Sequence, residues 1–130
     1  MLIDTSGLLC LIDRREAQRP AAETYFGAAS SRLLHNYVLA EFIALAQSRG
    51  VPRKAALDFA NDLEASDEVE LVWVLPELHS RAMDLLASRL DKEWSLCDAI
   101  SMVLMKDRGM REALTTDHHF EQAGFVRLLK

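Results

Sequence analysis

The sequence predicts an α/β fold with a central, mainly parallel sheet of four to five strands flanked by helices. The main observation is an alternation along the chain, in which short apolar or β-branched segments are followed by segments with helical spacing. The expected strands are residues 2–3, 32–35, 69–75, 113–115 and 125–129. The second observation is the composition: 50% of the 130 residues are hydrophobic and 27% are charged, which is typical of one globular domain spanning residues 1–130.

Net charge, apolar runs and cysteine content argue against a basic nucleic-acid-binding protein, a membrane protein and a disulfide-bonded secreted protein. The formal net charge of −5 argues against a protein that holds nucleic acid by general basicity, unless bound metal ions offset clustered acids. No apolar run reaches the roughly 18 residues of a transmembrane helix, and Met1 lies too close to the first strand for a signal peptide. Cys10 and Cys97 lie in apolar helical segments, where buried reduced thiols are expected. We therefore expect a cytosolic, cytoplasmic protein.

The first strand leads directly into a charged residue. Asp4 follows the strand at residues 2–3 and precedes an apolar helix at residues 8–12, for which Thr5 and Ser6 are predicted N-caps. A carboxylate between an apolar strand and an apolar helix is costly unless something pairs with it. In open α/β sheets this edge is also where ligands bind. The alternative is that Asp4 only caps the helix that follows.

Proline, glycine and capping residues place the other helices. Pro20, Pro52 and Pro76 each suit the first turn of a helix, and Asn36 is a predicted N-cap for a helix that stops before Gly50. The further expected helices are residues 20–29, 37–49, 52–65, 76–89, 95–109 and 118–123. Because right-handed crossovers bring the carboxyl ends of parallel strands to one edge, each strand–helix junction is a candidate wall of one site.

Three more acids occupy positions that a solvated surface does not explain. Glu41 interrupts an apolar helix within its first two turns, Asp98 lies in the first turn of another, and Asp117 follows the fourth strand. A helix N-terminus stabilises a negative charge by about 0.3–1 kcal/mol, too little to hold these acids and Asp4 together in a cleft. Divalent metal ions can offset the repulsion, and ligands that are all oxygen suit Mg²⁺ or Mn²⁺.

Each acid also has an ordinary structural explanation. Glu41 can be a solvent-facing helix residue, and Asp117 a turn residue after a strand. Asp98 follows Ser95 by three residues, the spacing of a capping box. A capping carboxylate can still bind a metal ion through its other oxygen. The agreement of four positions favours a shared metal site over four unrelated roles.

The histidines are weaker candidates for metal ligands. His118 and His119 adjoin Asp117, but neighbouring helical side chains point apart, and no other histidine has the spacing of a zinc motif. We therefore expect for them a structural role, or a role in supporting the metal ligands, and we expect His35 and His79 to be incidental.

Four stretches of the chain carry a family resemblance: LIDTSGLL, NYVLAEFIAL, DKEWSLCDAISMVLM and ALTTDHHFEQAGF. Through them the sequence resembles, from end to end, the PIN-domain ribonucleases of the VapC toxin type, from type II toxin–antitoxin systems. The resemblance implies a three-layer PIN-like fold, with a parallel sheet between helices. It also implies a metal-dependent endoribonuclease with an acidic site that binds Mg²⁺, or Mn²⁺ as a substitute, and hydrolyses RNA phosphodiester bonds.

The resemblance implies which residues form the site. The family's four acidic positions fall on the implied catalytic metal ligands Asp4, Glu41, Asp98 and Asp117. Its two hydroxyl positions fall on Thr5 and Thr115, which we expect to orient carboxylates or water. All four acids are present, so the sequence gives no sign of an inactive site.

The resemblance also implies partners, namely an RNA substrate, a cognate antitoxin protein and a second copy in a homodimer, with no membrane. Uncovered apolar sides on the helices at residues 20–29 and 51–65 are candidate docking surfaces. Arg14, Arg15 and Lys92 are candidates for holding substrate phosphates. Two alternatives stay open: a free-standing nuclease outside any toxin–antitoxin pair, and a non-catalytic module whose acidic cleft binds a basic peptide.

Overall fold

The computed structural model describes residues 1–130 and is built around a five-stranded sheet in the order β3-β2-β1-β4-β5. Every neighbouring pair of strands is parallel. The strands are β1 (Leu2–Ile3), β2 (Leu33–His35), β3 (Glu70–Val72), β4 (Glu112–Leu114) and β5 (Val126–Arg127). The predicted α/β class is confirmed, while the third and fifth strands are shorter than the sequence suggested.

Seven helices connect and follow the strands. They are α1 (Thr5–Ile12), α2 (Arg19–Ala28), α3 (Asn36–Ser48), α4 (Arg53–Ala65), α5 (Pro76–Ser88), α6 (Leu96–Arg108) and α7 (His119–Gln122). None of these helices is both long enough and apolar enough to pass through a lipid bilayer.

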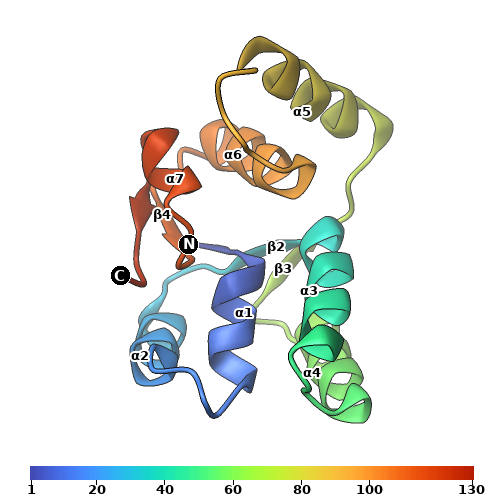
Figure 1. Ribbon diagram of the computed structural model, residues 1–130, viewed down its shortest axis with the longest axis vertical. Coiled ribbons are helices and arrows are strands. Elements are labelled where there is room, and N and C mark those ends of the chain that lie inside the picture. The colour runs from blue at the N-terminus through green and yellow to red at the C-terminus, as the bar shows by residue number, and fades with distance from the viewer.

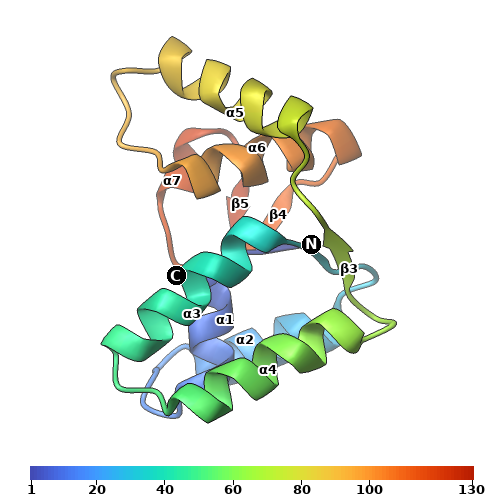
Figure 2. The ribbon, with the colours of Figure 1, turned by 90° about the vertical axis from the view of Figure 1, so that its right-hand side faces the viewer.

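The helices form two layers around the sheet. Helices α1 to α4 lie on one side, and α5 and α6 lie on the other, as Figures 1 and 2 show from two directions. Each layer has its own apolar cluster, one including Leu8, Phe42 and Leu63, the other including Ile100 and Phe120. This arrangement confirms the three-layer architecture.

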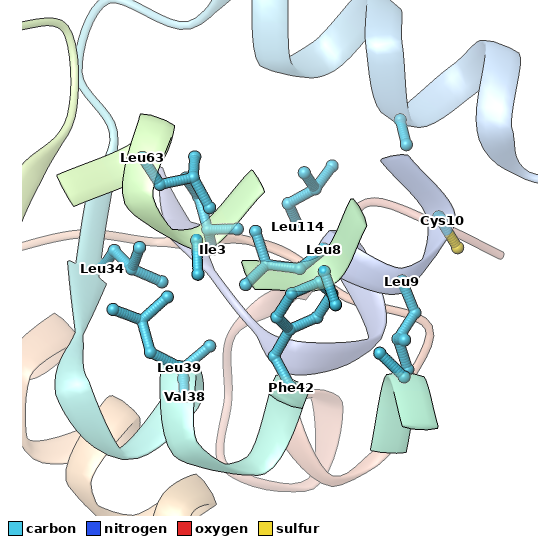
Figure 3. Close-up of a cluster of buried hydrophobic side chains, with 14 of the residues drawn as sticks. Ile3, Leu8, Leu9, Cys10, Leu34, Val38, Leu39, Phe42, Leu63 and Leu114 are labelled. Carbon is cyan, nitrogen blue, oxygen red and sulfur yellow. The ribbon is translucent and has the colours of Figure 1, made fainter. Parts of the chain in front are cut away.

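The strands supply side chains alternately to the two clusters. Ile3, Leu34 and Leu114 belong to the cluster of α1 to α4, whereas the preceding residues Leu2, Leu33 and Ala113 belong to the other. Successive side chains of a strand point to opposite faces, so strands covered on both faces read as uninterrupted apolar runs. Figure 3 shows the first cluster, with Phe42 of α3 beside Leu8 of α1.

The start of α3 differs from the prediction. His35, not Asn36, is the N-cap residue, and its Nδ1 accepts a 3.4 Å hydrogen bond from the Val38 N–H. Asn36 is the first helical residue, and its Oδ1 accepts a 2.6 Å hydrogen bond from the Val74 N–H. Asn36 therefore fixes the segment that leaves β3, and the expectation that His35 is incidental is wrong, since it caps α3.

Candidate active site

The four predicted acids line one cleft of about 250 Å³. Asp4 follows β1, and Asp117 follows β4 after two intervening residues. Glu41 lies in α3, which begins where β2 ends, and Asp98 lies in the first turn of α6. Because the sheet is parallel, the strand ends that precede these residues share one edge. The structure therefore brings together acids that are up to 113 residues apart in the sequence (4 to 117).

Asp4 is held through only one of its carboxylate oxygens. Its Oδ2 accepts hydrogen bonds from Thr115 Oγ1 at 2.8 Å and from Ser6 Oγ at 3.2 Å. Its Oδ1 is buried and has no hydrogen-bond partner. Asp4 occupies the N-cap position of α1, but its side chain makes no capping hydrogen bond. Thr5 is the first residue of the helix, so it is not the N-cap. The predicted N-cap role of Thr5 and Ser6 is therefore wrong, and capping does not explain Asp4.

Burial perturbs the acidity of Asp4 strongly. It raises the pKa of this carboxyl to about 7, against the opposing effect of the hydrogen bond from Thr115. The negative charges of Asp98 and Glu41 raise the pKa further. Buried polar groups nearly always have partners, so an orphaned carboxylate oxygen beside other acids needs an explanation. A divalent cation fits it, because a cation supplies both a ligand bond and the missing positive charge.

Asp98 forms the predicted capping box. The Asp98 N–H donates to Ser95 Oγ at 3.0 Å, and the Ser95 N–H donates to Asp98 Oδ2, also at 3.0 Å. His119 Nδ1 lies 3.0 Å from the same Oδ2. The two contacts of the Asp98 carboxylate, with the Ser95 N–H and with His119, both use Oδ2, so Oδ1 of Asp98 stays available for a ligand. Capping and ligand binding are compatible at this residue.

His119 lies between two of the acids. Besides its contact with Asp98, its Nδ1 is 3.3 Å from Oδ2 of Asp117, whose Oδ1 accepts a 2.9 Å hydrogen bond from the His119 N–H. The rings of His118 and His119 are 4.8 Å apart, centroid to centroid. The expectation that they point apart is wrong, because His118 is the N-cap residue of α7 and its Nδ1 lies 3.6 Å from Oδ1 of Asp117, beside His119. His119 positions Asp98 and Asp117 relative to each other.

Glu41 and Thr5 face the cleft without partners in the protein. Glu41 is half-buried and takes part in no hydrogen bond or ion pair within the chain. Thr5 is buried, and its Oγ1 has no hydrogen-bond partner. Glu41 therefore has free carboxylate oxygens in a residue that lines the cleft, while the Thr5 hydroxyl is buried without a hydrogen-bond partner.

Ser6 belongs to the hydrogen-bond network around Asp4, a role that the sequence did not predict. Its Oγ accepts a 3.0 Å hydrogen bond from the Thr116 N–H and lies 3.0 Å from Thr115 Oγ1. Thr115 Oγ1 in turn accepts a 3.0 Å hydrogen bond from the Asp117 N–H. Two hydroxyls thus connect the junction after β1 with the junction after β4. The signal in the sequence is the pair of consecutive hydroxyl residues after Asp4, which local patterns alone predict to be N-caps.

Gly7 allows α1 to approach β4 closely. A Cβ atom at Gly7 would lie 2.2 Å from the carbonyl oxygen of Leu114, a distance that real Cβ contacts do not show. Leu114 pairs with Ile3 and accepts a 3.2 Å hydrogen bond from the Asp4 N–H, so the approach at Gly7 packs α1 against the junction that joins Asp4 to Thr115. The faint signal in the sequence is a glycine inside an apolar helix, which is unfavourable unless another part of the chain approaches closely.

The basic residue in the cleft is Arg49, which was not predicted. Arg49 Nη1 forms a 3.0 Å ion pair with Glu16, and the side chain lines the cleft at the end of α3. Glu41, Leu45 and Arg49 all line the cleft, and their spacing of four residues is the helical signal that could have found it.

The three predicted phosphate-holding residues are not among those that line the acidic cleft. Arg14 and Arg15 line a different pocket, between α1 and the start of α4. Arg15 is committed to Asp13 through two 3.0 Å hydrogen bonds, and Lys92 is absent from the lining of the acidic cleft. Arg15 Nη2 donates a 2.6 Å hydrogen bond to the carbonyl oxygen of Arg49, so Arg15 contacts a residue of the cleft without lining the cleft itself.

Comparisons with known proteins agree with this architecture. The family model of the PIN domain matches residues 1–126. The 23S rRNA-specific endonuclease VapC20 of Mycobacterium tuberculosis, in strains H37Rv and CDC 1551, is 27% identical over 129 residues, covering 98% of this chain and 97% of that protein. The crystal structure of M. tuberculosis VapC20, described as a sarcin–ricin loop cleaving toxin, matches with a TM-score of 0.88 and 27% identity, covering 96% of this chain and 95% of that one. By its sequence and its fold, this chain belongs to the PIN-domain family of nucleases.

Proposed function

We propose that this protein is a divalent-metal-dependent endoribonuclease that hydrolyses RNA phosphodiester bonds in the acidic cleft. The observation that carries the proposal is the buried Oδ1 of Asp4, which has no partner and lies in the cleft with three further acids. A protein interior does not keep an unpaired carboxylate without a cost of several kcal/mol. An unpaired carboxylate beside Glu41 and Asp98 therefore favours the binding of a cation in this cleft.

The chemistry of the donors suggests which cation. Asp4, Glu41 and Asp98 would hold it directly, and Asp117 directly or through water. Carboxylate oxygens suit hard ions such as Mg²⁺, with Mn²⁺ as a substitute. When bound, such an ion lowers the pKa of a water molecule and offsets the charge that builds on the phosphate.

The remaining residues of the cleft position these groups. Thr115 and Ser6 fix Oδ2 of Asp4, so that Oδ1 keeps its direction. His119 holds Asp98 and Asp117 at a fixed separation. The free hydroxyl of Thr5 orients a solvent molecule in the cleft. Arg49, at the cleft wall, attracts a phosphate of the RNA backbone.

We further propose that the protein is the toxin of a toxin–antitoxin pair and acts in the cytoplasm as a homodimer. Similarity to VapC20 over nearly the full length of both chains supports this role. An antitoxin that inserts an arginine or lysine into the cleft would form charge-assisted hydrogen bonds with the same carboxylates that bind the metal ion. Because VapC20 is specific for 23S rRNA, the sarcin–ricin loop is the first substrate to test.

A cleavage assay tests the proposal. Purified wild-type protein and Asp4→Asn are incubated with total RNA and with a sarcin–ricin stem-loop, in Mg²⁺, in Mn²⁺ and in EDTA. We expect wild-type cleavage only with a divalent ion, and none by Asp4→Asn, which is nearly isosteric. Cleavage in EDTA, or undiminished cleavage by the variant, would contradict the metal mechanism.

The biological role needs separate experiments. Expression of the wild type should arrest growth, expression of Asp4→Asn should not, and co-expression of a short neighbouring reading frame should relieve the arrest. A cleaving protein that is harmless and monomeric points to the free-standing nuclease. A protein that cleaves no RNA but binds basic peptides points to the non-catalytic module.

A further inference from the structure

A buried histidine lies outside the acidic cleft and takes no part in the proposed chemistry. His35, at the end of β2, is 0% exposed, and so is Ser101 in α6. His35 Nε2 lies 2.8 Å from Ser101 Oγ. Nδ1 of the same ring accepts the N–H of Val38, so the ring proton is on Nε2 and is donated to Ser101. Burial lowers the pKa of His35 to about 3, which keeps the imidazole neutral at physiological pH.

This hydrogen bond connects the two helices that carry opposite walls of the cleft. His35 caps α3, which carries Glu41, while Ser101 lies three residues after Asp98 in α6. Residues three apart on a helix share a face, about 4.5 Å apart along the axis. Helix α3 belongs to one layer and α6 to the other. The His35–Ser101 bond is the only side-chain hydrogen bond between α3, including its cap, and α6.

The two helices need a restraint of this kind. Glu41 and Asp98 are both negatively charged, both raise the pKa of Asp4, and both face the cleft that Asp4 lines. Their mutual repulsion favours a wider separation of α3 and α6. A metal ion that binds both carboxylates requires one particular separation, and outer groups that fix ligand positions typically change metal affinity by 10–100-fold when they are lost.

We propose that His35 and Ser101 form a brace that fixes the spacing of Glu41 and Asp98 and thereby sets the affinity of the cleft for a divalent cation. Both are positioning residues, since neither lines the cleft. The inference rests on the proposed metal-binding function of the cleft and adds to it a buried pair beneath the site.

Two substitutions remove the brace in different ways. Ser101→Ala removes the acceptor and leaves the cap of α3 in place. His35→Asn keeps a side chain that is favourable at an N-cap but is too short to reach Ser101. We expect each variant to bind Mn²⁺ about tenfold more weakly, as measured by electron paramagnetic resonance of free Mn²⁺. RNA cleavage should return to within about twofold of wild type at saturating Mn²⁺, because the brace acts on affinity and not on the reacting groups.

The double variant is the sharpest test. If the two residues act only through their mutual bond, His35→Asn combined with Ser101→Ala should bind Mn²⁺ no more weakly than either single variant. The control is Leu63→Ala in α4, a buried site in the cluster of α1 to α4 that lines no part of the cleft. This variant should lose stability and keep wild-type Mn²⁺ affinity.

The outcomes separate the brace from the function on which it rests. Wild-type Mn²⁺ affinity in folded Ser101→Ala or His35→Asn, with binding lost in Asp4→Asn, overturns the brace alone. An equal loss of affinity in Leu63→Ala overturns it as well, since general destabilisation would then explain the effect. A wild-type protein that binds no Mn²⁺ overturns both the proposed function and the brace.

Discussion

Thr115 Oγ1 donates a 2.8 Å hydrogen bond to Oδ2 of Asp4 across 111 residues of sequence. The bond occupies one carboxylate oxygen and leaves the other, Oδ1, buried without a partner. One side of Asp4 is therefore committed to the fold and the other to a ligand. Because the two oxygens of Asp4 have different roles, the contribution of the Thr115 hydroxyl to the site can be tested separately by substitution.

Thr115→Val replaces the hydroxyl by a methyl group of similar size. We expect metal affinity or cleavage to fall about 10–100-fold, because Asp4 loses the bond that orients it. The same change removes an interaction that lowers the pKa of Asp4, so that pKa should rise further. Metal titration and cleavage assays would measure the effect. Thr116→Val is the matched control, since its side chain makes no hydrogen bond to the cleft residues, and a similar loss there would count against the role of Thr115.

The metal-free protein should lose stability as the pH rises. The pKa of Asp4 is raised from 3.8 to about 7 in the folded state, so the folded protein holds this proton more tightly than the unfolded chain. The stability that this group contributes is fully present below about pH 4 and is lost as the pH rises through about 7. In EDTA we expect a falling melting temperature between pH 5 and 8, by roughly 3 °C or more for each kcal/mol lost.

Two controls accompany the pH experiment. Asp4→Asn should flatten the decline, because an amide does not titrate. Mg²⁺ should raise the melting temperature of the wild type above pH 7, by an amount equivalent to about 2.7 kcal/mol at one hundred times the dissociation constant. A decline of the same size in Asp4→Asn would assign the effect to other groups.

Gly7→Ala should damage both the fold and the site. The added methyl group would lie 2.2 Å from the carbonyl oxygen of Leu114, so α1 must move away from β4. We expect a loss of stability of about 1–3 kcal/mol, typical of overpacking, together with reduced metal binding as Asp4 and Thr115 separate. Gly27→Ala in α2 is the control, because nothing lies within 4 Å of its Cβ position. That change should be neutral or stabilise by about 0.5–1 kcal/mol, and thermal unfolding compares the two.

Arg49→Gln should weaken the binding of RNA more than it slows the chemical step. Arg49 lines the cleft, whereas Arg14 lines a separate pocket and serves as the control in Arg14→Gln. If Arg49 contacts one phosphate, its loss should reduce the slope of log affinity against log salt concentration by about 0.7 for single-stranded RNA. Binding should be measured with Asp4→Asn as the background, to prevent cleavage. An unchanged slope, or an equal change in Arg14→Gln, would remove Arg49 from the substrate site.

Local signals in the sequence predict the helices well and the strand ends less well. Pro76 begins α5, and Ser95 and Gly109 flank α6, as the proline, capping-box and glycine patterns indicate. The third strand was predicted to reach Leu75 but ends at Val72, which pairs with His35. Beyond His35 the neighbouring chain turns into α3, so the residues after Val72 have no strand to pair with. The length of a strand depends on its neighbour, which a local pattern does not contain.

The residues that sequence reasoning missed are those whose partners are distant. Histidine is not a preferred N-cap, so no local pattern indicates His35, and its second partner, Ser101, is 66 residues away. Gly7 matters only because Leu114 approaches it. The acids were found, because charges within apolar segments are visible without knowing the fold. The hydroxyls and basic residues that surround them are unremarkable until their neighbours are known.

The position of β1 in the sheet has a consequence for the order in which the cleft assembles during synthesis. Of the five strands of this sheet β1 is synthesised first, yet it pairs on one side with β4, which lies more than a hundred residues later (Leu2 with Ala113). A nascent chain that ends before β4 leaves one edge of β1 open and lacks both Thr115 and Asp117. Pairings between residues so distant in sequence form late in folding. The topology therefore delays the completed acidic cleft until nearly the whole domain has been translated.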